Sequence, residues 1–249
     1  MTDFPSAPPV AASFLFTDGQ RPAADAIRSL SHLPAGLFGF SVSALPEEPD
    51  HWLELLSLGL TFDLEGLAPG EAVLPPQCER LLGLADDFDP SIYGAIRLQP
   101  ASHIRAGRAL LPIVRVMIGI AAELTRLDNV KAVIWEPSAC AIRPQSFSSL
   151  GKSWLKGSAF PVGGLIVIET IDGNRVRSKG LRWFAGHEVE IASSKAGDLP
   201  VLSRLLGKVI ERITEQGAAP SLGFLAGLEL EAIGLPVPGS PILRLSKSA

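Results

Sequence analysis

The sequence predicts an α+β fold, a largely antiparallel mixed sheet with helices packed on one face. Three observations support this prediction. Strand and helix patterns are interspersed along the chain, many strands follow one another as hairpins, and 47% of the 249 residues are hydrophobic. Hairpin-linked strands pair antiparallel, and a chain of this size buries about three quarters of its unfolded surface. A duplicated, ferredoxin-like plan is one form of this fold, although no internal repeat indicates it.

The N-terminal part of the chain alternates between short apolar runs and Pro/Gly breaks. Asp18-Gly19 is a turn signal, and Pro22 suits a first helical turn. Residues 53–64 have strand character, with a helix beginning at Asp50 as an alternative. We expect a strand over 13–17, a helix over 22–30, strands over 37–45 and 53–64, a short helix over 77–84 and a strand over 93–98.

The C-terminal part carries the clearest patterns. Residues 107–127 are apolar almost all round, which is typical of a buried helix, and Asp172-Gly173-Asn174 is a hairpin turn signal. Residues 199–216 carry one apolar stripe at helical spacing, with Gly217 as a natural stop. The remaining expected elements are strands over 130–135, 162–171, 175–184, 188–191, 227–231 and 242–245 and a helix over 146–156.

Composition limits the class of protein. The net charge of −4 gives no basic excess, so we expect no nucleic acid partner. The most apolar stretch, residues 109–127, contains Arg115, Glu123 and Arg126, so it favours a buried helix over a membrane span. Two cysteines indicate free, mostly buried thiols, with a single disulfide as the alternative.

The domain organisation is predicted from the ends and the middle of the chain. The Pro- and Ser-containing start predicts a disordered leader over residues 1–12, without the pattern of a secretory signal. We therefore expect a cytoplasmic protein. Residues 13–249 are predicted to form a single α+β domain, with a division into two lobes near residue 100 as a possible substructure.

Sequence motifs for catalysis, metals and nucleotides are incomplete. Gly151-Lys152-Ser153 resembles the end of a phosphate loop, but Ser146 stands where the first glycine is needed. The two S-x-x-K patterns at 149–152 and 153–156 lack their companion motifs, and G-x-S-x-G is absent. No His or Cys spacing is typical of a metal site. We therefore predict no catalytic residue, metal ligand or cofactor.

One acidic strand provides the candidate binding residues. Glu188 and Glu190 lie on one face of the predicted strand, and His187 points away from both because neighbouring side chains alternate. The simplest interpretation is that this face contacts solvent or a partner. Trp135, most simply a core aromatic residue, ends another predicted strand and completes the candidate set.

Several short motifs follow one another in a recognisable order: an apolar helix, a strand ending in Trp, a hairpin, and a glycine followed by an E-x-E-I strand. These are Ala121-Ala122-Glu123-Leu124, Ala132-Val133-Ile134-Trp135, Gly180-Leu181 and Gly186-His187-Glu188-Val189-Glu190-Ile191. Together with an opening strand and helix over 14–30, they resemble an uncharacterised bacterial family, a domain of unknown function. The resemblance implies a shared fold and no known activity or site residues, and residues 47–89 depart from it.

Two functions from different classes follow from these patterns. The favoured hypothesis is a non-enzymatic binding or regulatory module of a bacterial cell with a protein partner, because catalytic motifs are missing. The alternative is an enzyme whose site is assembled from distant residues around the His187–Glu190 strand, with Lys152 as a further candidate. The sequence indicates neither the ligand nor the oligomeric state.

Overall fold

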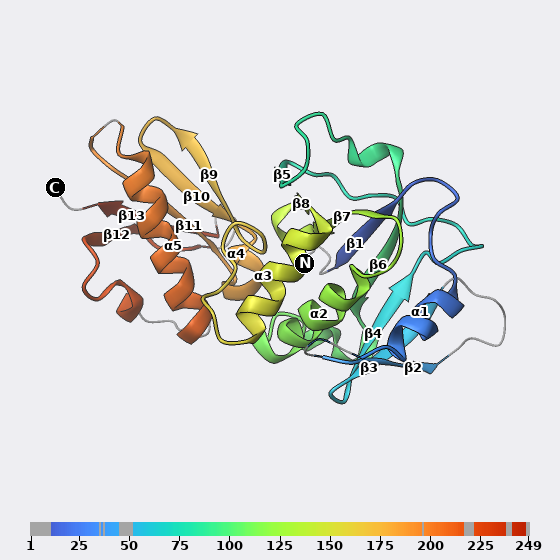
Figure 1. Ribbon diagram of the computed structural model, residues 1–249. Helices are drawn as coiled ribbons and strands as arrows, with labels where there is room; N and C mark the ends of the chain where they lie inside the picture. The colour runs from blue at the N-terminus through green and yellow to red at the C-terminus, as the bar shows by residue number, and fades with distance from the viewer. Residues whose placement is uncertain are drawn as a thin grey trace, which may run out of the picture. The chain divides into compact units, whose positions relative to one another are not determined.

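The computed structural model describes residues 11–34, 36, 38–44, 52–195, 197–216, 222–237 and 241–247. The described residues contain helices and two mixed, mostly antiparallel sheets, which confirms the predicted α+β class. The chain divides into two compact units between residues 158 and 159 (Figure 1). This differs from the expected division near residue 100, where the chain is instead the end of a strand paired on both sides. The ferredoxin-like duplication stays a prediction.

The unit that precedes residue 159, here called the eight-stranded unit, is built on a sheet of order β2-β3-β4-β6-β1-β7-β8-β5. All neighbouring strands are antiparallel except β5 and β8. Its elements are β1 (Ala12–Phe16), α1 (Ala24–Ser31), β2 (Ser41–Ala44), β3 (Trp52–Ser57), β4 (Leu60–Glu65), β5 (Arg80–Leu82), β6 (Gly94–Pro100), α2 (Leu111–Leu124), β7 (Val130–Trp135), β8 (Cys140–Ile142) and α3 (Pro144–Leu155).

The two faces of this sheet are covered differently. Helices α2 and α3 pack on one face, against β4, β6 and β7 (Figure 1). On the opposite face, Leu15, Ala95 and Ile134 belong to a buried cluster that is covered by side chains of segment 73–93, which includes β5. The part of this second face formed by β3 and β4 lies beyond that cluster, where the 3-10 helix over 102–107 contacts β4.

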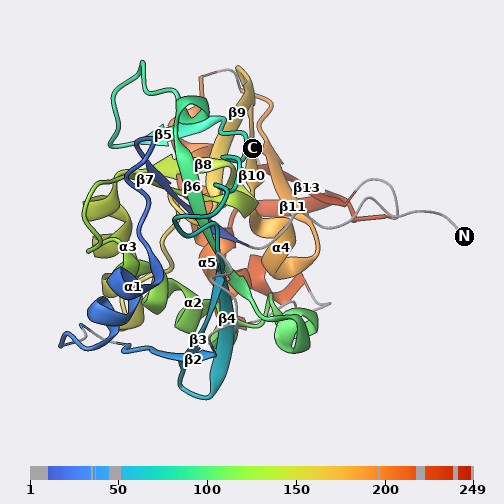
Figure 2. The same cartoon turned by 90° about the vertical axis from the view of Figure 1, so that its right-hand side faces the viewer.

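The unit that follows residue 158, here called the five-stranded unit, has a sheet of order β12-β13-β11-β10-β9. Only β11 and β13 are parallel, and α5 packs against β9, β10 and β11. Figures 1 and 2 both show α5 lying along these strands. The elements are β9 (Val167–Asp172), β10 (Arg175–Lys179), α4 (Leu181–Ala185), β11 (Glu188–Ala192), α5 (Leu199–Gln216), β12 (Leu230–Gly234) and β13 (Ile242–Lys247).

Several elements match their sequence patterns closely. The strand predicted over 130–135 and the helix predicted over 199–216 have the observed bounds of β7 and α5. The apolar stripe of α5 is buried, as Leu202, Leu206 and Val209 show. The long apolar pattern over 107–127 forms a shorter helix, because residues 102–107 form a 3-10 helix instead.

Other elements differ from the predictions. Residues 53–64 form the β3–β4 hairpin, and Leu58 lies in its turn with a positive φ of 49°. The helix predicted over 77–84 is instead irregular chain and the strand β5, which pairs with β8. Strand β8 was not predicted. The strand predicted over 175–184 ends at Lys179, and the helix α4 follows. Sheet pairing between distant segments decides these cases, and local spacing does not encode it.

The expected leader over residues 1–12 falls largely outside the described residues. Ala11 and Ala12 are described and fully buried, and Ala12 begins β1. Both cysteines are free, with Cys140 buried and Cys78 half-buried. Within the part of the chain that the structure describes, no helix combines the length and the apolar character needed to cross a membrane.

Candidate functional site

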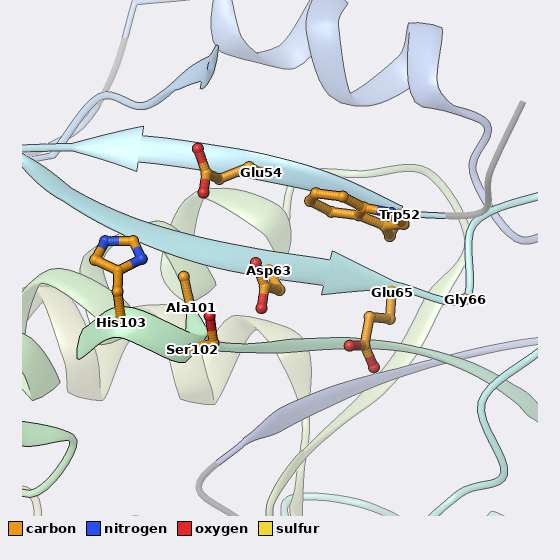
Figure 3. Close-up of a pocket in the computed structure, with 8 residues that line it drawn as sticks. All are labelled: Trp52, Glu54, Asp63, Glu65, Gly66, Ala101, Ser102 and His103. Atoms are coloured by element: carbon orange, nitrogen blue, oxygen red, sulfur yellow. The ribbon is translucent and has the colours of Figure 1, made fainter. Parts of the chain in front are cut away.

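A pocket of about 580 Å³ lies in the eight-stranded unit, over the strands β3 and β4. Three carboxylates, a tryptophan and a histidine dominate its lining. Figure 3 shows Asp63 in the middle of this group, between Glu54 and Ser102. The lining residues are Trp52, Glu54, Asp63, Glu65, Gly66, Ala101, Ser102 and His103.

The alternation of the β3–β4 hairpin places these side chains together. Leu53, Leu55 and Phe62 point to the helix-covered face and are buried. The residues between them point to the other face. The pairing register sets Glu54 opposite Asp63 and Trp52 opposite Glu65. A hydrophobic/acidic alternation on each strand therefore becomes a cluster of carboxylates on one surface.

Asp63 is the electrostatically unusual member of the pocket. Partial burial raises the pKa of Asp63, and the neighbouring carboxylates of Glu65 and Glu54 raise it further. Arg105 and His103 oppose this shift with smaller effects. No described residue donates a hydrogen bond to the Asp63 carboxylate. Its negative charge is therefore stabilised less well than in water, and a cation placed beside it would be favoured.

The other polar groups of the pocket are held by neighbours. The Gln99 Nε2 donates to Glu65 Oε1 at 2.7 Å, and the Ser43 hydroxyl donates to Glu54 Oε1 at 2.6 Å. The His103 Nε2 lies 2.9 Å from Thr61 Oγ1, which anchors residues 102–107 against β4. These contacts hold Glu54, Glu65 and His103 in place, whereas neither oxygen of Asp63 accepts a hydrogen bond from a described residue.

Gly66 closes one end of the pocket. It has a positive φ of 82°, and a Cβ at this position would lie 2.7 Å from the backbone oxygen of Ala95. Arg21 reinforces the turn by donating to the Gly66 and Gly70 carbonyl oxygens. Only glycine permits this close approach of the chain to β6. The backbone therefore fixes where β4 ends and the position of Glu65.

The chemistry available in the pocket is acidic and aromatic. Among the described residues, no three His, Cys, Asp or Glu side chains gather closely enough to hold a metal ion. What the pocket offers is a negative potential beside the indole ring of Trp52. Carboxylates and an aromatic face together are suited to organic cations.

The structure places the predicted site residues elsewhere. Glu188 is oriented by the start of α4: it accepts hydrogen bonds from the Ser178 hydroxyl at 2.5 Å and from the backbone N–H groups of Gly180, Leu181 and Arg182 at 3.0–3.2 Å. Burial raises the pKa of Glu188, and these hydrogen bonds act against that rise. The acceptors of Glu188 are therefore used within the fold, and the expected solvent- or partner-facing role of this strand face stays a prediction.

Glu190 is also internal to the five-stranded unit. It is 4% exposed, and both Nε and Nη2 of Arg177 donate to its Oε2 atom. Arg175 and Arg244 lie at 3.8 and 3.9 Å from its Oε1 atom. Glu190 itself is therefore shielded from solvent by the cross-strand arginines, and the expected solvent- or partner-facing role of this strand face stays a prediction.

His187 and Trp135 do not join these carboxylates. The His187 Nδ1 lies 3.0 Å from the Ala185 oxygen, its Nε2 is buried with no hydrogen-bond partner among the described residues, and burial lowers the pKa of this side chain. Trp135 is fully buried at the end of β7 in the eight-stranded unit. Lys152, the further candidate, pairs with buried Glu123 of that unit at 3.7 Å. These contacts do not support the alternative hypothesis of an enzyme site around His187.

None of the pocket residues is predicted as a site residue from the sequence. A signal is nevertheless present, because acidic residues alternate with leucine in Leu53-Glu54-Leu55 and Asp63-Leu64-Glu65. No protein-family model matches the chain, and neither curated proteins nor solved structures provide a match. The resemblance to the uncharacterised bacterial family stays a prediction.

Proposed function

We propose that this protein is a binding module whose β3–β4 pocket receives a positively charged organic group, an amine or a guanidinium. The observation that carries the proposal is the state of Asp63. Its carboxylate lies between two others, has a raised pKa and receives no hydrogen bond from any described residue. A bound cation would relieve this repulsion, so that binding and ionisation of Asp63 support each other.

The aromatic wall distinguishes an organic cation from a simple counter-ion. Trp52 lies opposite Glu65 in the hairpin register, at the edge of the pocket. An indole face attracts an ammonium or guanidinium with about 0.5–1 kcal/mol at exposed sites. Trp52 also offers apolar area to the methylene groups beside the charge. The pocket therefore supports a ligand with a cationic head and a short apolar stem.

The test is a titration of the full chain with methylguanidinium and with n-butylamine, followed by NMR of the Trp52 indole N–H. We expect saturable shifts for both cations and none for n-butanol, the neutral analogue. The Asp63→Asn variant should weaken binding about fivefold, which corresponds to about 1 kcal/mol. Affinity should rise with pH above about 4, as Asp63 becomes ionised.

Asp18→Asn is the matched control, because it removes the same charge from an exposed turn outside the pocket. It should leave the affinity of both cations unchanged. Equal weakening by the two variants would show that only the net charge matters, and equal binding of n-butanol would show that the pocket recognises the stem. Either result contradicts the proposal.

A further inference from the structure

A row of alternating charges crosses the outer surface of the five-stranded sheet, opposite α5. The register pairs Glu169 of β9 with Arg177 of β10 and Arg177 with Glu190 of β11. Glu190 in turn pairs with Arg244 of β13, and Arg244 with Gly234 of β12. Each charged side chain in the row thus has an opposite charge on its neighbouring strands, until the row reaches a residue with no side chain.

Arg244 is the incompletely paired member of this row. Its only contact with an acidic group of the described residues is the 3.9 Å approach of Nε to Glu190 Oε1, which is too long for a hydrogen bond. The closer contacts of Glu190 belong to Arg177. The Arg244 side chain is 44% exposed. Its guanidinium therefore keeps a planar set of donors that no acceptor among the described residues engages.

The charge balance around Glu190 also indicates that Arg244 lacks a negative partner. Three guanidiniums, those of Arg175, Arg177 and Arg244, surround Glu190, and Arg175 is also paired with Asp172 at 2.5 Å. Together with the neighbouring Lys179–Glu169 ion pair, the network contains four positive and three negative groups among the described residues, a surplus of one positive charge. One further carboxylate would neutralise it.

Gly234 leaves space for that carboxylate. A Cβ built on Gly234 would meet the stem of Arg244 at 3.4–3.8 Å, which is ordinary van der Waals contact. Its φ is not in the left-handed region, so the position does not require glycine for its backbone conformation. The row therefore ends beside a place where an acidic side chain fits and where no described residue supplies one; Glu231, the acidic residue of β12, pairs instead with Ser246.

We propose that Arg244, beside Gly234, binds an acidic side chain of a polypeptide partner, whose carboxylate takes the last position of the charge row. A guanidinium and a carboxylate form two parallel hydrogen bonds in one plane, which gives both attraction and orientation. The surplus of a single charge favours one carboxylate over a phosphate dianion. This surface is independent of the cation pocket of the eight-stranded unit.

The test uses the full chain and a tetraglutamate peptide capped at both ends, with the Arg244 Nε–Hε signal followed by NMR. We expect a saturable shift that weakens with added salt. Arg244→Gln should reduce the affinity about tenfold, as expected for losing a charge-assisted hydrogen-bond pair. Arg204→Gln, on the exposed side of α5, removes the same charge and should leave the affinity unchanged.

Gly234→Glu provides a second, independent variant. Its carboxylate should occupy the place beside Arg244, so the chain should fold normally and lose peptide binding, whereas Gly234→Ala should retain it. Peptide binding that survives both Arg244→Gln and Gly234→Glu would overturn the proposal. Tighter binding of inorganic phosphate than of the peptide at Arg244 would also overturn it, because the site would then be a phosphate site. Acetate alone binding as tightly as the peptide would exclude a polypeptide ligand.

Discussion

Both units carry acidic residues at alternate positions of a strand, but the charges that lie across from these residues are opposite in sign in the two units. In the eight-stranded unit, Glu54 stands directly opposite Asp63, so like charges meet across the hairpin. In the five-stranded unit, Glu190 stands between Arg177 and Arg244. Like charges opposite one another destabilise a sheet, and opposite charges stabilise it. The residue across the strand, more than the acidic residue itself, decides whether a carboxylate serves the fold or is available to a ligand.

The largest expected effect is a difference in the free energy of unfolding between a variant of Glu190 and a variant of Glu54. Glu190→Gln leaves the surrounding guanidiniums without their counter-charge, so we expect a loss of about 2 kcal/mol in the free energy of unfolding. Glu54→Gln makes the same chemical change in the pocket, and we expect a change within about 0.5 kcal/mol. Urea unfolding of the full chain, followed by circular dichroism, measures both. Similar losses for the two variants would remove the distinction between them.

The second expected effect is a pH dependence confined to the five-stranded unit. Burial lowers the pKa of His187 below its ordinary value of 6.5, so the unfolded chain binds this proton more readily than the folded chain. Stability should therefore fall as the pH drops below about 6.5. His187→Phe should reduce this fall.

The control for His187 is His103→Phe, which changes an exposed histidine of the pocket and leaves His187 in place. Thermal unfolding at several pH values between about 5 and 8 would compare the two variants with the unmodified chain. An unchanged pH dependence in His187→Phe would contradict the role assigned to this side chain.

The smallest expected effect is an increase in the free energy of unfolding, produced by Asp63→Asn. Asp63 has a raised pKa, so its ionisation at neutral pH costs stability, and Asp63→Asn should stabilise the chain by at most about 0.5 kcal/mol. The gain should shrink as the pH falls through the raised pKa of Asp63 and disappear well below pH 3.8, where the carboxyl is protonated in both the folded and the unfolded chain. Melting temperatures at neutral and acidic pH would show it. A variant that stabilises the fold while weakening cation binding is the pattern expected of a binding residue.

The sequence predicts those elements whose stability is local. The stripe of α5 and the β-branched run of β7 specify a helix and a strand through their own spacing, and both have the expected bounds. Residues 77–84 carry no such pattern. Three of these residues form β5 because they pair with β8, about 60 residues later in the chain. The residue spacing within either segment does not predict a pairing over that sequence distance.

The site residues show the same limit. Alternation correctly placed Glu188 and Glu190 on a strand, but it does not reveal what lies across from them. Their partners, Ser178 and Arg177, are recognised only once β10 is paired with β11. The pocket likewise needs the turn at Gly59 and the contact of residues 101–103 with β4 before its carboxylates become neighbours.

The alternating charges on the five-stranded sheet also constrain how its strands can align during folding. A shift of β10 by one residue would turn Arg175 and Arg177 toward α5 and bring Val176 to the surface. A shift by two residues would keep the faces correct, but it would set Arg175 or Lys179 opposite Glu190 and would move the Ser178 hydroxyl away from Glu188. Apolar burial therefore excludes the first misalignment, and the loss of a hydrogen bond to a carboxylate disfavours the second.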